Sequence, residues 1–68
     1  MELKSHEEIL GQLTNVEVLE DGQIKLRFSI HKEIELSANA LSVPQLQSLI
    51  GSSIGIININ DQFFLREI

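Results

Sequence analysis

The sequence predicts a mainly β (α+β) fold, and three observations support that prediction. Apolar and polar residues alternate over long stretches, turn signals interrupt the alternation, and one strong helix signal lies between the third and fourth predicted strands. The expected order is helix-β-β-β-helix-β-β. This order matches a small five-stranded OB-like barrel with an extra helix in front. An SH3-like or Sm-like barrel, or an open antiparallel sheet with two helices, fits the same order.

The chain has 68 residues, which leaves room for a single small domain over residues 1–68. We expect an N-terminal helix over about residues 6–13 and a barrel over about residues 14–68. A chain of this size buries only about 60% of the surface that its unfolded form exposes. Small domains gain stability from disulfides, metals or oligomerisation. The sequence has no cysteine, and His6 and His31 form no ligand cluster, so self-association is the remaining option.

The first predicted element is the N-terminal helix. Ser5-His6-Glu7-Glu8 fits the capping-box pattern, in which the serine hydroxyl accepts a hydrogen bond from the backbone N–H three residues on. An apolar stripe at helical spacing follows, formed by Ile9, Leu10 and Leu13. Gly11 weakens this helix by about 1 kcal/mol relative to alanine. A helix this short must dock on the rest of the domain.

From Thr14 the apolar period changes to two, which is typical of half-buried strands. The first two strands are separated by Glu20-Asp21-Gly22. A two-residue Asp-Gly loop would mix the polar and apolar faces, whereas a three-residue loop with Gly22 in the left-handed region keeps them apart. The three-residue loop predicts three cross-strand pairs: Val18 with Ile24, Val16 with Leu26, and Glu17 with Lys25.

Residues 23 to 37 fit either one long bent strand or two strands joined at His31-Lys32-Glu33. The apolar residues continue at even positions as far as Leu36, with Lys32 as the interruption. The tripeptide contains no Gly, Pro, Asn or Asp to signal a turn. Strands usually run about 3 to 10 residues, so we predict two strands.

The strongest local signal in the chain is Leu41-Ser42-Val43-Pro44-Gln45-Leu46. Ser42 is the expected N-cap and Gln45 completes a capping box. Pro44 lies in the first turn, where its missing N–H costs nothing. The buried stripe of this helix is expected to comprise Leu46, Leu49 and Ile50. Gly51 is the expected residue that closes the helix.

The last two strands lie around GIININDQFFLREI and are joined near Asn60-Asp61. Apolar residues occupy both faces of this hairpin, and Phe63 and Phe64 lie on opposite faces. One hypothesis is that the N-terminal helix covers the outer face. The other is that part of the outer face stays open and contacts a partner, because a contiguous exposed apolar area usually marks an interface.

No residue pattern in the chain indicates catalysis, so we predict that the protein is not an enzyme and has no cofactor. Ser52 and Ser53 form no nucleophile elbow, and neither histidine has a recognisable serine or cysteine partner. His31, Glu33 and Glu35 could line one strand face but lack further donors, so we expect no metal. With neither a signal-peptide core nor about 20 consecutive apolar residues, we expect a cytoplasmic location and no membrane contact.

The leading prediction is a non-catalytic protein-interaction or self-association module, with a protein partner or a homo-oligomer as its contact. The candidate protein interface comprises Ile54, Ile56, Phe63, Phe64 and Ile68. The alternative is an OB-like nucleic-acid-binding domain that uses a basic strand face. Its candidate contacts are Lys25, Arg27, Lys32 and Arg66. The acidic composition, with a net charge of −5, disfavours this alternative, as does the absence of Trp and Tyr as stacking platforms.

Overall fold

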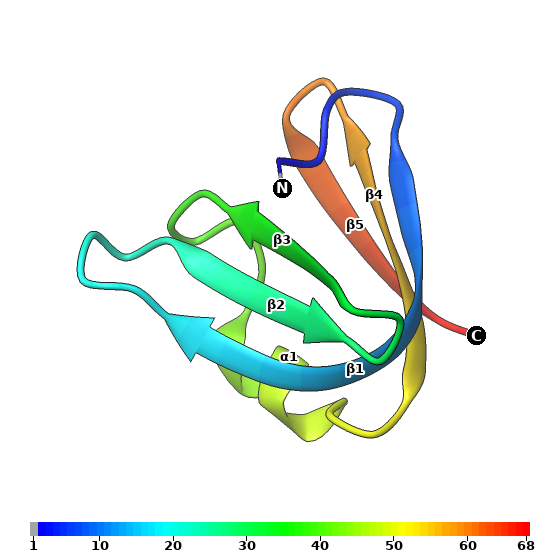
Figure 1. Cartoon of the computed structure of the whole chain (residues 1–68). Helices are drawn as coiled ribbons and strands as arrows, with labels where there is room; N and C mark the ends of the chain where they lie inside the picture. The colour runs from blue at the N-terminus through cyan, green and yellow to red at the C-terminus, as the bar shows by residue number, and fades with distance from the viewer. Residues whose placement is uncertain (1) are drawn as a thin grey trace.

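A computed structural model describes residues 2–68 and contains one antiparallel sheet of five strands in the order β3-β2-β1-β4-β5 (Figure 1). The elements are β1 (Glu8–Val18), β2 (Ile24–Phe28), β3 (Lys32–Leu36), α1 (Val43–Ser48), β4 (Ser53–Ile59) and β5 (Gln62–Glu67). The predictions of a mainly β chain and of a short helix between the third and fourth strands are confirmed.

The predicted N-terminal helix is wrong, because residues 8–13 form the first half of β1. Ile9 pairs with Ile56 of β4, and both side chains are buried. Ile9 and Leu13 are four residues apart, a spacing that fits one face of a strand as well as one face of a helix. A short helix containing Gly11 is weak by itself, so the hydrogen-bonded ladder with β4 decides the structure.

The predicted capping box is absent as well. Residues 5–6 form a turn, with His6 in the left-handed region at φ 68°. The Glu7 carboxylate accepts a hydrogen bond from the Lys4 backbone N–H at 2.7 Å. The Ser5 hydroxyl accepts one from the Asn60 backbone N–H at 3.1 Å, in the turn that joins β4 and β5. The same polar side chains therefore serve to anchor the start of β1.

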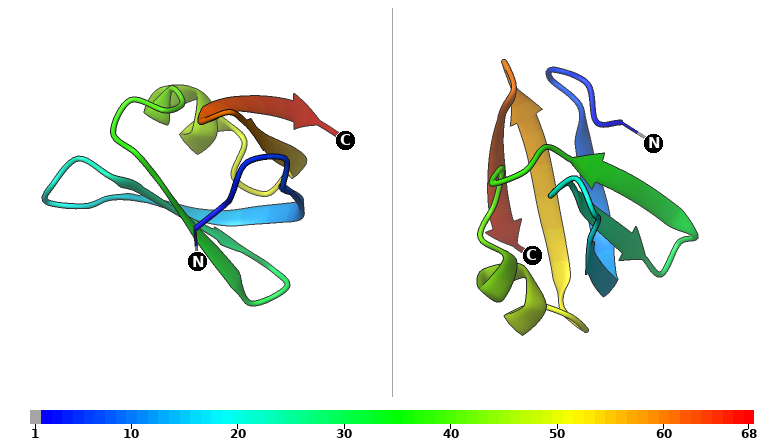
Figure 2. Two further views of the ribbon diagram at one scale, coloured as in Figure 1. Left: turned by 90° about the horizontal axis from the view of Figure 1, so that it is seen from above. Right: turned by 90° about the vertical axis from the view of Figure 1, so that its left-hand side faces the viewer.

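The long strand β1, of 11 residues, is shared by two halves of the sheet. Its C-terminal part pairs with β2 in the first half (β1-β2-β3), and its N-terminal part pairs with β4 in the second half (β1-β4-β5). The register shifts between Leu13 and Asn15, and such a bulge bends a strand. The two halves therefore curl around a common core (Figures 1 and 2).

The curled sheet is not closed, since no ladder joins β3 to β5 within residues 2–68. A closed barrel is therefore not confirmed. Of the predicted alternatives, the open antiparallel sheet describes these strands, with one helix in place of two. Helix α1 lies at the end of the sheet where β5 ends (Figure 2).

The three-residue loop between β1 and β2 is confirmed, together with all three of its predicted cross-strand pairs. The Leu19 backbone N–H donates to the Gln23 carbonyl at 2.8 Å, and Gly22 has φ 88°. The break into β2 and β3 is also confirmed. The turn falls at residues 29–31, slightly earlier than predicted, and His31 takes the left-handed conformation at φ 60°.

Helix α1 forms where its signals predicted. The Ser42 hydroxyl accepts a hydrogen bond from the Gln45 backbone N–H at 3.4 Å. Leu46 and Leu49 are buried, whereas Ile50 is 44% exposed, which corrects its expected place in the buried stripe. Helix α1 ends at Ser48 with Leu49 as its C-cap, so Ile50 lies beyond the helix and its side chain does not continue the buried stripe.

Among residues 2–68, the core contains twelve buried apolar side chains and one buried polar residue, Asn58. Asn58 Nδ2 donates to the Leu3 carbonyl at 2.7 Å, and its Oδ1 accepts from the Asp61 backbone N–H at 2.8 Å. Asn58 therefore ties the N-terminal segment to the β4–β5 turn. Turn chemistry explains Asn60 and Asp61, which both have positive φ, while Asn58 is a buried anchor.

Candidate functional site

The two faces of the C-terminal hairpin have different surroundings. Ile54 and Ile56 of β4 are fully buried against the core, and Phe63 and Leu65 of β5 pack partly buried beside them. Of the predicted interface residues, Ile54 and Ile56 are thus corrected to core residues with no surface for a partner. Phe64, 51% exposed, and Ile68, 69% exposed, are accessible. The prediction that the two phenylalanines lie on opposite faces is confirmed.

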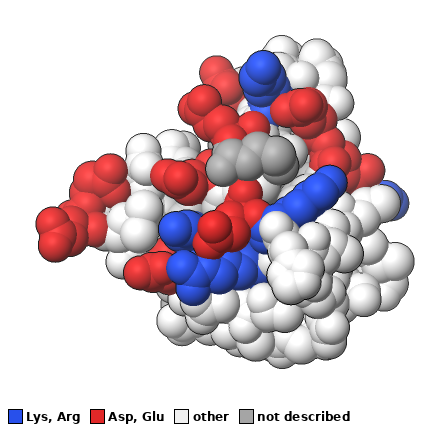
Figure 3. Space-filling model, viewed as in Figure 1, with Lys and Arg blue, Asp and Glu red and all other residues white. Residues whose placement is uncertain are grey.

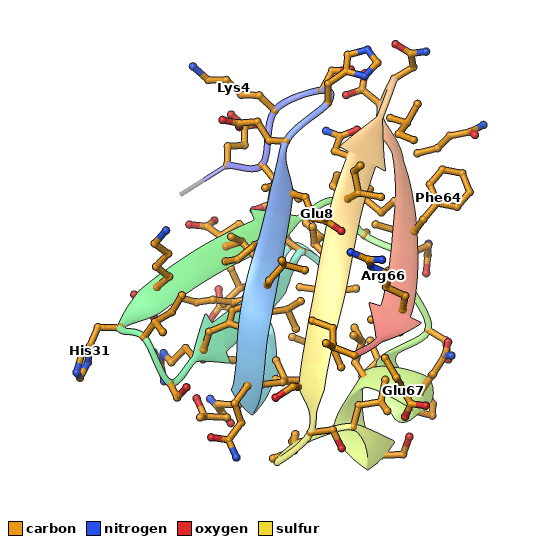
Figure 4. The ribbon with its side chains drawn as sticks, turned by 90° about the vertical axis from the view of Figure 1, so that its right-hand side faces the viewer. Lys4, Glu8, His31, Phe64, Arg66 and Glu67 are labelled. Atoms are coloured by element: carbon orange, nitrogen blue, oxygen red, sulfur yellow. The ribbon has the colours of Figure 1, made fainter. Side chains whose placement is uncertain are left out.

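The other face of the second half of the sheet carries a set of apolar side chains that we term the apolar outer face. Its members are Leu10 of β1, Ile57 and Ile59 of β4, and Phe64 of β5. Ile57 lies directly opposite Phe64 in the ladder, and Leu10 lies opposite Gly55. Leu10 is 47% exposed, and Phe64 projects outward from β5 (Figure 4).

Residues 6–13 do not cover this face, because they form part of it. As a helix they would have lain over the hairpin. As the first part of β1 they lie beside β4 in the same sheet and add Leu10 to its outer surface. Leu10, Ile57 and Ile59 were not among the predicted interface residues. Successive side chains of a strand point to opposite faces, so a strand that begins at Glu8 and buries Ile9 would have placed Leu10 on the outer face.

An ion pair borders the apolar outer face. Arg66 of β5 and Glu8 of β1 approach to 3.3 Å across β4, and Figure 4 shows the two side chains pointing toward one another. Gly55 lies beneath them and makes this approach possible. A Cβ atom at Gly55 would lie 2.6 Å from Leu10 Cδ2 and 3.3 Å from Glu8 Oε2.

Strand β5 leaves one of its two edges open. The Ile68 backbone N–H donates to the Ser53 carbonyl at 3.0 Å, and alternate residues of an antiparallel strand bond to the same neighbour. The backbone groups of Phe63, Leu65 and Glu67 therefore point away from β4. Within residues 2–68 these N–H groups have no backbone partner. We term this side of β5 the open edge.

A groove runs between the open edge and α1. Its volume is about 390 Å³, and it is lined by Gln45, Ser48, Leu49, Leu65, Arg66 and Glu67. Helix α1 contributes its exposed polar side chains and the edge of Leu49. An extended chain that paired with the open edge would have its inward side chains in this groove.

The outer face of the first half of the sheet is charged. Arg27 of β2 donates to Glu33 of β3 at 2.5 Å and approaches Glu17 of β1 at 3.8 Å. Lys25 approaches Glu33 at 3.7 Å. The hydrogen bond from Arg27 holds the pKa of Glu33 below its ordinary value, and Glu33 in turn raises the pKa of Arg27. Cations and carboxylates alternate over this surface (Figure 3).

The predicted nucleic-acid contacts do not form one surface. Lys25 and Arg27 lie on β2 and Lys32 begins β3, while Arg66 lies on β5, on the outer face of the other half. Lys25, Arg27 and Arg66 each contact a carboxylate. The positive charge of β2 is therefore largely balanced within the chain.

Residues 2–68 contain neither a metal-binding cluster nor a membrane-spanning helix. They contain no group of three His, Cys, Asp or Glu side chains placed to hold a metal ion. His31 projects from the β2–β3 turn, away from the remainder of the sheet (Figure 4). None of the helical structure described is long and apolar enough to span a membrane.

Within residues 2–68, the apolar outer face is thus partly exposed, and the open edge has no backbone partner. Comparison with protein-family models, with curated proteins and with solved structures finds no match to this chain.

Proposed function

We propose that this protein is a non-catalytic self-association module that joins copies through the second half of its sheet. The observation that carries the proposal is the open edge of β5 beside an uncovered apolar outer face. Unpaired strand edges are templates for pairing with another chain, and native proteins usually block them. Apolar surface next to such an edge adds a hydrophobic contribution to the pairing.

The small size of the chain supports the same proposal. The described molecule exposes 4323 Å² of surface, and its core consists of twelve apolar side chains. A standard interface buries about 800 Å² on each partner, which is roughly a fifth of this surface. Burial on that scale would add substantially to the stability of so small a domain.

Light scattering and sedimentation at micromolar concentration test this proposal. We expect a mass of twice the monomer for the wild-type chain. Phe64→Lys should shift the equilibrium toward monomer by about tenfold or more, because it places a charge in the apolar contact. Ile30→Lys is the matched control, since Ile30 is 49% exposed in the β2–β3 turn and lies on the first half of the sheet.

A monomeric wild-type chain at the highest attainable concentration contradicts the proposal. So does a dimer that Phe64→Lys and Ile30→Lys weaken equally, because the second half of the sheet then has no special part in the contact. Circular dichroism of both variants confirms that each one is folded.

Nucleic-acid binding is the second candidate, and the strand order favours it. We propose an OB-like architecture, since a five-stranded, partly open barrel with a helix between its third and fourth strands gives this order when it opens between β3 and β5. OB-folds bind oligonucleotides on the face of their second and third strands. In this chain the outer face of these strands carries Lys25 and Arg27 together with Glu33 and Glu35, whereas Lys32 lies opposite Phe28 on the other face.

Fluorescence anisotropy with labelled single-stranded oligonucleotides at low salt tests the second candidate. The paired carboxylates predict no binding, or weak binding that falls steeply as salt rises. Glu33→Gln would release Arg27 and Lys25 and should then increase the affinity. Tight binding by the wild-type chain that Arg27→Ala abolishes would favour nucleic-acid binding over self-association.

A further inference from the structure

We propose that the open edge binds β5 of a second copy of this chain, antiparallel to itself, about a two-fold axis at Leu65. This inference rests on the proposed self-association and specifies its geometry. The product is a continuous ten-stranded sheet. In a two-fold interface each copy contributes the same surface, so the strand must complement itself.

Backbone geometry restricts how two β5 strands can pair. The groups that point outward from the open edge belong to Phe63, Leu65 and Glu67, and these must face one another. Five antiparallel registers meet this condition, with the two-fold axis at residue 63, 64, 65, 66 or 67. A slip by a single residue would place hydrogen-bonding groups opposite residues that face β4.

Charge excludes three of the five registers. An axis at Phe64 places Glu67 opposite Asp61 of the second copy. An axis at Arg66 or at Glu67 places that residue opposite its own equivalent. Like charges directly opposite one another destabilise a strand pair.

The two remaining registers differ in length. With the axis at Phe63, only the first part of β5 is paired, and Leu65 lies opposite Asp61 in the hairpin turn. With the axis at Leu65, all residues of β5 are paired, and Phe63 lies opposite Glu67. The Leu65 register is thus the longest one without a repulsive pair.

On the outer side, this register places Phe64 opposite Arg66 of the second copy. The pair does not exchange backbone hydrogen bonds, which is the arrangement that brings side chains closest. A guanidinium over an aromatic ring is an attractive contact. Arg66 is 66% exposed at its side chain, so it can reach the ring while it remains near Glu8. The contact occurs twice because of the two-fold axis.

On the inner side, the register directs Phe63 of the second copy toward Glu67, at the mouth of the groove between β5 and α1. Leu49 and Leu65 supply the apolar part of the groove lining. Phe63 is only partly buried in the isolated chain, so pairing would cover more of its ring. The groove and the half-covered ring are thus complementary across the axis.

Cross-linking of a single cysteine tests this geometry, because the chain has no cysteine of its own. Facing residues of a hydrogen-bonded antiparallel pair have Cα atoms about 5.5 Å apart. A short bis-maleimide should therefore convert Leu65→Cys into a covalent dimer as the main product. The exposed control Ile30→Cys should give little covalent dimer under the same conditions, because its thiols lie far from the two-fold axis.

A second measurement avoids any substitution. In a sample that mixes isotope-labelled and unlabelled wild-type chains, we expect intermolecular nuclear Overhauser effects between the Phe64 ring and the Arg66 side chain. A proven dimer that shows neither these contacts nor the Leu65→Cys cross-link overturns the proposed register and leaves self-association standing. A wild-type chain that stays monomeric overturns both proposals.

Discussion

The two halves of the sheet share a core but have opposite outer surfaces. In the first half, Arg27 contacts Glu17 and Glu33, and Lys25 contacts Glu33. In the second half, the outer face carries four large apolar side chains, those of the apolar outer face, and Arg66 and Glu8 form its single ion pair among residues 2–68. Lys25 and Arg27 of the first half therefore have carboxylate partners within the chain. The apolar side chains of the second half are left partly exposed, and this is why we propose that the interaction occurs there.

The two edge strands of the sheet, β3 and β5, also differ: one edge is partly covered and the other is open. At β3, Glu2 forms an isolated parallel bridge with Glu35, so the N-terminal segment partly protects that edge. Figure 2 shows this segment on the β3 side of the molecule. No corresponding bridge protects β5 within the described residues. This difference between the two edges is the reason that our proposal places self-association at β5 and not at β3.

The largest expected effect is a loss of stability when a residue on the inner face of β4 is truncated, compared with its neighbour on the outer face. Ile56→Ala should lower the free energy of unfolding by about 2–5 kcal/mol, because it leaves a cavity in the shared core. The neighbouring substitution Ile57→Ala should cost less, since Ile57 is only partly buried. Urea denaturation at low protein concentration measures both values without a contribution from association. Equal losses would contradict the assignment of the two faces.

The next effect concerns the anchor of the N-terminal segment. Asn58→Ala removes the side chain that bonds to the Leu3 carbonyl and the Asp61 N–H, and should cost about 1–3 kcal/mol. Hydrogen exchange at the Asp61 amide should become faster. Asn60→Gly is the matched control, because Asn60 has φ 52° and glycine adopts this conformation readily. An unchanged Asp61 exchange rate in Asn58→Ala would contradict this role.

The smallest effect lies on the charged first half and depends on pH. The hydrogen bond from Arg27 lowers the pKa of Glu33 in the folded state. A lowered folded-state pKa contributes stability that is present above the unfolded-state pKa of about 4.3 and is lost as pH falls through the folded-state value. Glu33→Gln should therefore flatten the acid limb of stability against pH. Glu20→Gln is the control, since Glu20 is exposed in the β1–β2 loop. An identical flattening in both variants would exclude a specific Arg27–Glu33 contribution.

The elements that the sequence predicted correctly have local causes. Gly22 permits the loop that keeps Val18 opposite Ile24, and Ser42 with Pro44 begins α1. The turn at Asn60-Asp61 likewise follows from side chains that tolerate positive φ. Each of these depends on residues within a few positions along the chain.

The candidate site was predicted only in part. Phe64 and Ile68 were identified and are exposed, whereas Ile54 and Ile56 were placed on the wrong face. The alternation was visible, but both faces of β4 are apolar, so the pattern alone does not say which face is buried. Leu10, Ile57 and Ile59 can be assigned to the apolar outer face only when it is known which strands lie beside β4.

By itself, the sequence determined the turns, the short helix and the alternation of faces, because local backbone preferences set them. The tertiary structure alone decided that residues 8–13 form a strand, because the ladder to β4 joins segments more than 40 residues apart. Residues 8–13 form a strand beside β4 and not a helix over the outer face of the hairpin. As a result Leu10 joins the outer surface, and within residues 2–68 Ile59 and Phe64 remain exposed while Ile57 is partly buried.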